Sequence, residues 1–108
     1  MLSERAIKYF DAFGSADIAG VSDFLSENVC LRDWNLDVCG INAVLIEYSN
    51  IFKSLSSIAV CVVAIYEVEL TVIAELIITA EEIGAIKVVD VLSFDEKGKI
   101  RSIRAYKG

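Results

Sequence analysis

The spacing of hydrophobic residues changes from a helical to a strand pattern near the middle of the chain. Over residues 3–13 apolar side chains recur every three or four positions, with Ser3 as a candidate N-terminal cap and Gly14 as the stop. Asp17 is the expected cap of a second, short helix. The same spacing returns over residues 41–52. The first half of the chain is therefore predicted to supply three helices.

Strands are expected mainly in the second half, where Val, Ile and Thr dominate. Three helices followed by four long strands predict an α+β fold, a curved antiparallel sheet wrapped around the helices. The other expected elements are a short strand over residues 27–33, a loop over residues 34–40, strands over residues 58–69 and 70–82, and a hairpin over residues 86–106 with its turn at residues 95–98.

Composition narrows the class of protein. A chain of 108 residues fits one domain, residues 1–108, and its net charge of −6 leaves no basic patch for nucleic acid. The longest apolar run, residues 58–66, is too short to cross a membrane. The N-terminus lacks the basic end and apolar run of a signal peptide. We therefore expect a cytoplasmic protein with no membrane or nucleic-acid partner.

Cysteine and histidine usage limits the chemistry. The three cysteines form no CxxC pair, and the chain has no histidine, so neither a zinc site nor a Cys–His nucleophile is expected. Cys61 lies in a valine-rich run and is read as a small core residue. Acid–base chemistry would fall to Asp, Glu, Tyr or Lys.

Asp90 is the most unusual polar residue, because it stands mid-strand between apolar neighbours. Alternation places it on one face with Val88, Leu92 and Phe94. A carboxylate buried there would need hydrogen-bond donors or a proton. The alternative is an edge-strand aspartate that reaches solvent.

Three further polar residues stand at positions that should face inward. Tyr9 adjoins the apolar face of the first helix, Tyr48 lies on the inward side of the third, and Asp33 ends the short strand. Together with Asp90 they could line one apolar cavity. Taken singly, each tyrosine could be a core ring with its hydroxyl at the rim, and Asp33 a solvated loop acid or a cap.

The strand over residues 58–65 is apolar on both faces. Helices can cover only one of these faces, so a partner subunit is expected on the other. The sequence therefore predicts a homodimer packed through the outer face of the sheet.

The order of elements and the last hairpin, Val-Asp-Val-Leu-Ser-Phe-Asp-Glu-Lys-Gly-Lys-Ile-Arg-Ser-Ile-Arg-Ala-Tyr, resemble the nuclear-transport-factor-2-like (NTF2-like) superfamily in its SnoaL-like and ketosteroid isomerase branch. The resemblance implies a cystatin-like cone. It also implies roles for four residues: Tyr9 and Asp90 as donors to a carbonyl oxygen, Asp33 as the base, and Tyr48 as support for Tyr9. Trp34 stands where the family usually has proline.

The resemblance further implies a ketosteroid isomerase-like enzyme that moves a proton within an enolisable ketone and needs no cofactor. Its partner would be a small apolar carbonyl compound, and related lyase or cyclase chemistry is an open variant. Phe13, Trp34, Val88 and Leu92 are the expected substrate contacts. The alternatives are a non-catalytic domain that binds a small hydrophobic ligand and an NTF2-like dimerisation module, because fold does not fix function.

Overall fold

The helices form at the three predicted places, and one cap differs from the prediction. The structure is a computed structural model that describes all 108 residues. Asp17 caps the second helix by accepting a hydrogen bond from the N–H of Gly20. Ser3 does not cap the first helix, because its N–H and hydroxyl both donate to Glu67 on a strand, each at 2.9 Å. The helices are α1 (Leu2–Gly14), α2 (Ile18–Ser22) and α3 (Ile41–Ser54).

Six strands form one sheet in the order β2-β1-β6-β5-β4-β3. The predicted α+β class, with a curved sheet wrapped around three helices, is confirmed. The loop predicted over residues 34–40 is wrong in part, since it contains a short strand. The strands are β1 (Leu25–Arg32), β2 (Asp37–Cys39), β3 (Ala59–Val68), β4 (Thr71–Ala80), β5 (Gly84–Phe94) and β6 (Ile100–Lys107).

One pairing departs from the expected antiparallel sheet. β1 runs parallel to β6, whereas every other neighbouring pair is antiparallel. A period of two predicts which face a side chain occupies and says nothing about the neighbouring strand. The parallel contact joins the first part of the chain to its last strand, so the sheet is mixed.

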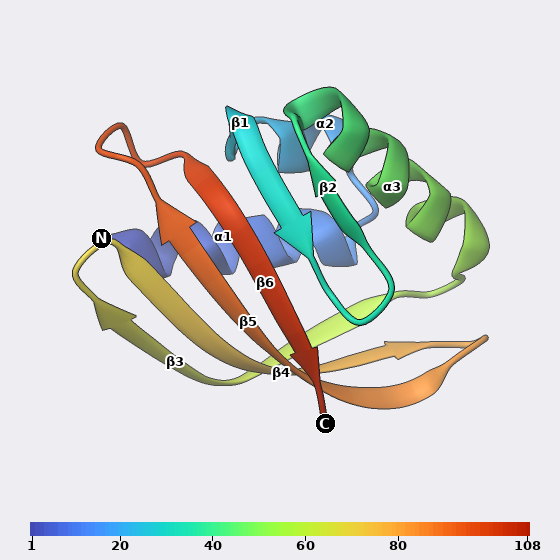
Figure 1. Cartoon of the computed structure of the whole chain (residues 1–108). Coiled ribbons are helices and arrows are strands. Elements are labelled where there is room, and N and C mark those ends of the chain that lie inside the picture. The colour runs from blue at the N-terminus through green and yellow to red at the C-terminus, as the bar shows by residue number, and fades with distance from the viewer.

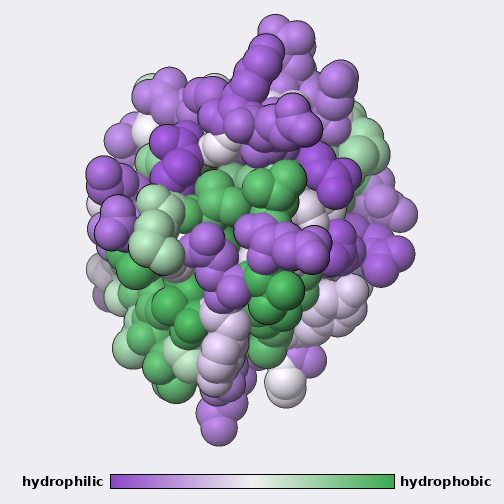
Figure 2. Space-filling view, turned by 90° about the vertical axis from the view of Figure 1, so that its left-hand side faces the viewer, coloured by the Kyte–Doolittle hydropathy of each residue, from purple (hydrophilic) through white to green (hydrophobic).

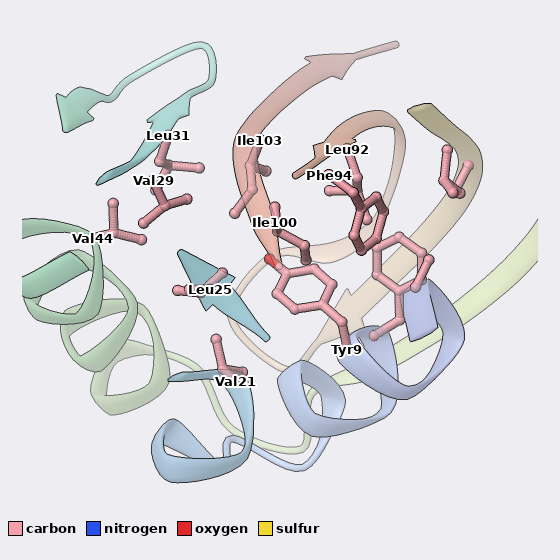
Figure 3. Packing of buried hydrophobic residues seen from close by; sticks show 14 of the residues in the cluster. Tyr9, Val21, Leu25, Val29, Leu31, Val44, Leu92, Phe94, Ile100 and Ile103 are labelled. Atoms are coloured by element: carbon pink, nitrogen blue, oxygen red, sulfur yellow. The ribbon is translucent and has the colours of Figure 1, made fainter. Parts of the chain in front are cut away.

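The helices cover the concave face of the sheet, and the long strands curve beneath α1 (Figure 1). Buried side chains from both layers form one core, in which the ring of Tyr9 lies among sheet residues such as Ile100 (Figure 3). Cys61 is not part of this core. It is exposed on the outer face opposite Ile77, because alternation along β3 turns its neighbours inward. No helix is both long and apolar enough to cross a membrane.

Candidate functional site

An open pocket of about 390 Å³ lies between the helices and the inner face of the sheet. Of its 22 lining residues, 16 are hydrophobic, and none is lysine or arginine. A concave, mostly apolar site with a few polar groups is the usual form of a small-molecule site. All four predicted catalytic residues line this one pocket, namely Tyr9, Asp33, Tyr48 and Asp90.

Tyr9 of α1 and Tyr48 of α3 share a hydrogen bond between their hydroxyl oxygens, 2.5 Å apart. Both residues face inward because they stand on the apolar stripes of their helices. Burial raises the pKa of Tyr9 well above its usual value, and nearby Tyr48 and Asp90 raise it further. Burial also raises the pKa of Tyr48, although the hydrogen bond to Tyr9 opposes this. Both phenols are therefore neutral and can donate.

Asp90 of β5 is only 8% exposed and accepts no hydrogen bond within the chain. Burial raises the pKa of Asp90 to about 7, and the negative charge of Asp33 contributes to the increase. Its cross-strand partners are Ala74 and Ala105. These small neighbours leave space above the carboxyl, so that Asp90 lines the pocket instead of being covered by a larger side chain.

Asp33 follows β1 and is half-buried at the pocket. Its Oδ1 atom accepts hydrogen bonds from the N–H groups of Asn35 at 2.7 Å and Leu36 at 2.8 Å. Its Oδ2 atom accepts none from the chain. The loop thus fixes one carboxyl oxygen and leaves the other available for a substrate. Arg32 is exposed and does not line the pocket, so the groups that hold Asp33 are the backbone N–H groups of Asn35 and Leu36.

Several solved structures have a fold similar to that of this chain. SalBIII, an epoxide hydrolase/cyclase-like enzyme of pyran ring formation in the polyether salinomycin, is 21% identical with a TM-score of 0.84, over 99% of this chain and 90% of that protein. An NTF2-like protein of unknown function from Cytophaga hutchinsonii is 13% identical with a TM-score of 0.85, over 100% and 90%. This chain has the NTF2-like fold.

A candidate ketosteroid isomerase from Kribbella flavida has the same NTF2-like architecture. It is 14% identical to this chain, with a TM-score of 0.82 over 95% of this chain and 74% of that protein. No family model matches the sequence, and no curated protein matches it. Identities this low establish the fold and leave the activity open.

Three of the four expected substrate contacts line the pocket of this NTF2-like fold. They are Phe13, Trp34 and Val88. Leu92 does not line it and is fully buried. Although Leu92 shares a face with Asp90, it lies further along β5, where core side chains such as Phe94 and Ile100 fill the space (Figure 3).

The mouth of the pocket carries polar residues of α3 that the sequence did not reveal. Glu47, Asn50 and Ser54 line it beside the predicted Tyr48. Their spacing of three and four residues places them on one side of the helix, adjacent to the apolar stripe. This spacing of polar residues along α3 is the feature of the sequence that could have identified them as pocket residues. No group of three or more metal-ligating side chains gathers in the chain.

A disulfide between Cys30 and Cys39 joins β1 to β2. The two residues are direct partners in the antiparallel register. Three scattered cysteines do not predict this pair, because the sequence pattern predicts a loop where the structure has the β1–β2 hairpin that brings the two together. The disulfide closes the hairpin that carries Asp33 and Trp34 to the mouth of the pocket.

Proposed function

We propose that this protein is a ketosteroid isomerase-like enzyme that moves a proton within an enolisable ketone. The observation that carries the proposal is the meeting of two neutral phenols, a buried acid and a loop carboxylate in one open apolar pocket. Two carboxyl groups with different environments can serve as donor and base, which is the established logic of ketosteroid isomerases. The proposed reaction requires no metal or organic cofactor.

In the proposed reaction the ketone oxygen lies between Tyr9 and Asp90. Either hydroxyl can donate in the hydrogen bond between Tyr9 and Tyr48. The proposed reaction uses the arrangement in which Tyr48 donates, because the Tyr9 proton is then free for the ketone oxygen. Asp33 Oδ2 removes a proton from the adjacent carbon, and the electron pair moves into a dienolate whose oxygen accepts the two hydrogen bonds. Asp33 then returns the same proton at the far end of the conjugated system, so the product is an isomer.

A ligand-binding domain without catalysis is the second candidate. The observation that favours it is the pair of N–H groups bonded to Asp33, because a purely structural turn would use the carboxyl in the same way. The open pocket counts against the third reading, a dimerisation module, since such a module needs no cavity.

Asp33→Asn distinguishes the two leading candidates. The amide oxygen of asparagine can still accept from the N–H groups of Asn35 and Leu36, so the loop is kept while the base is lost. We expect wild-type protein to convert β,γ-unsaturated ketones to conjugated isomers, measured by ultraviolet absorbance, and the variant to lose conversion yet retain binding. Absence of enone formation by wild-type protein over a range of such ketones would overturn the proposed activity.

A further inference from the structure

The polar groups of the pocket lie in two separate places. Asp90 lies at the inner end with the two tyrosines, more than nine-tenths buried and without a hydrogen-bond partner. No fully buried side-chain oxygen in the chain lacks a partner, so the Asp90 carboxyl is open to the pocket, where a ligand or solvent completes its hydrogen bonding. The second group lies at half-buried or exposed positions and is called the mouth cluster here. It comprises Asp33, Asn35, Glu47, Asn50 and Ser54.

The mouth cluster presents hydrogen-bond acceptors and negative charge. Glu47 is half-buried and has neither an ion pair nor a hydrogen bond within the chain. The hydroxyl of Ser54 donates to the backbone carbonyl of Asn50 at 2.7 Å, which leaves its oxygen as an acceptor. Asp33 offers its free Oδ2 atom. Two carboxyl groups thus face the mouth, and no lysine or arginine lines the pocket itself. One ammonium lies outside it, where Lys107 Nζ is 5.8 Å from the centroid of the Trp34 ring.

We propose that the pocket selects elongated apolar molecules with a carbonyl or phenol oxygen at the inner end and a hydrogen-bond donor, an ammonium or a hydroxyl group, at the outer end. Glu47 is the specificity-determining residue of this selection. A carboxylate or phosphate at the outer end would meet two like charges, offset only in part by Lys107 beside Trp34, and the field of a chain whose net charge is −6. The assignment of the inner end rests on the proposed function, whereas that of the outer end rests on the mouth cluster alone.

Three fluorescent naphthols test the proposal directly. They share the phenol and the ring system and differ only in the group on the far ring: aminomethyl, hydroxymethyl or carboxylate. We expect dissociation constants at low salt to increase in that order. Because the mouth is partly exposed, the difference between amine and carboxylate should shrink when salt is added.

Glu47→Gln should reduce the ratio of the dissociation constants of the carboxylate and the aminomethyl naphthol by about two- to fivefold. This is the effect expected of one partly exposed charge pair. Glu96→Gln is the matched control, because Glu96 is exposed in the β5–β6 turn, outside the pocket, and its loss changes the net charge equally. Asp90→Ala should weaken all three naphthols alike, by about ten- to hundredfold.

A carboxylate that binds as tightly as the amine would overturn the proposal, and so would an equal effect of the Glu47 and Glu96 substitutions. Failure of all three naphthols to bind would also overturn it. Enone formation from neutral ketones by wild-type protein depends on Asp33 and not on the outer group. It therefore tests the proposed function separately from the mouth selection.

Discussion

Tyr9 and Tyr48, 39 residues apart in sequence, place their hydroxyl oxygens 2.5 Å from each other inside the pocket. Only one of the two protons can lie between these oxygens, so the other is available to a ligand. The pair thus couples α1 to α3 and leaves one phenol proton beside Asp90.

The two tyrosines should respond differently to removal of their hydroxyls. Tyr48→Phe removes the support and should cost about 1 kcal/mol in phenol binding, whereas Tyr9→Phe removes the donor and should cost about 1.5–3 kcal/mol. Titration calorimetry with a simple naphthol measures both losses. Equal losses would contradict the assignment of Tyr9 as the residue that contacts the ligand.

The stability of the protein should depend on Asp90 between about pH 4 and pH 7. Burial raises the pKa of Asp90 from 3.8 to about 7 in the folded protein. Between these values the folded chain holds a proton that the unfolded chain has lost, so the free energy of unfolding falls as pH rises. The full decrease from this one group is at most about 4 kcal/mol.

Asp90→Asn should remove that dependence while keeping the shape of the side chain. Urea unfolding of both proteins across the pH range gives the difference, and other carboxyl groups cancel in the comparison. The variant should be the more stable protein above pH 7, and the advantage should disappear near pH 4. A constant difference at all pH values would mean that Asp90 titrates as a solvated acid.

The sequence predicts that Tyr9, Tyr48 and Asp90 face inward, because the periods of the helix and of the strand determine which face a side chain occupies. A spacing of three and four residues turned Tyr9 and Tyr48 toward the sheet, and alternation along β5 placed Asp90 on the face of Val88. These inferences need only the local chain. The inward orientation of these three residues was therefore predicted correctly even though the strand pairing was predicted only in part.

The disulfide, the burial of Leu92 and the space above Asp90 depend on which strands are neighbours and in which register. The periodicity of the sequence does not encode that information. Cys30 meets Cys39 only through the β1–β2 register, and the same sheet register places Leu92 between Val72 of β4 and Ile103 of β6 in the core. The space above Asp90 likewise depends on Ala74 and Ala105 in the two flanking strands. Each of these requires the register of the sheet in addition to the face of each residue.

Reduction of the Cys30–Cys39 disulfide should lower the free energy of unfolding by about 2–3 kcal/mol, as expected for a bond that closes a short loop. Thiol titration of the unfolded chain should give one free thiol before reduction and three after. Cys61→Ser should leave the sensitivity to reductant unchanged. Disulfides are rare in a reducing cytosol, so this bond counts against the predicted cytoplasmic location. Three free thiols in protein purified without reductant would contradict the bond.

The outer face of the sheet carries an apolar patch on the side opposite the helices. Tyr66 and Tyr106 are each more than half exposed there, and alternation places Ile73, Val89 and Val91 on the same face. On the side of the molecule in Figure 2, apolar side chains gather in the lower part, over the strands that curve beneath the helices. Glu75 and Arg104 stand on the same face beside Val89 and Val91. An exposed apolar surface with charged residues next to it favours association.

We predict that this patch is the interface of a homodimer. Tyr66→Glu should yield a monomer in sedimentation velocity at micromolar concentration, because each copy would place a new charge in an apolar interface. Ile46→Glu is the matched control, since Ile46 is 61% exposed on α3, away from the sheet. The control should remain a dimer. Sedimentation of the wild-type protein as a monomer would contradict the prediction. The outer sheet face would then be an exposed apolar surface without a partner copy.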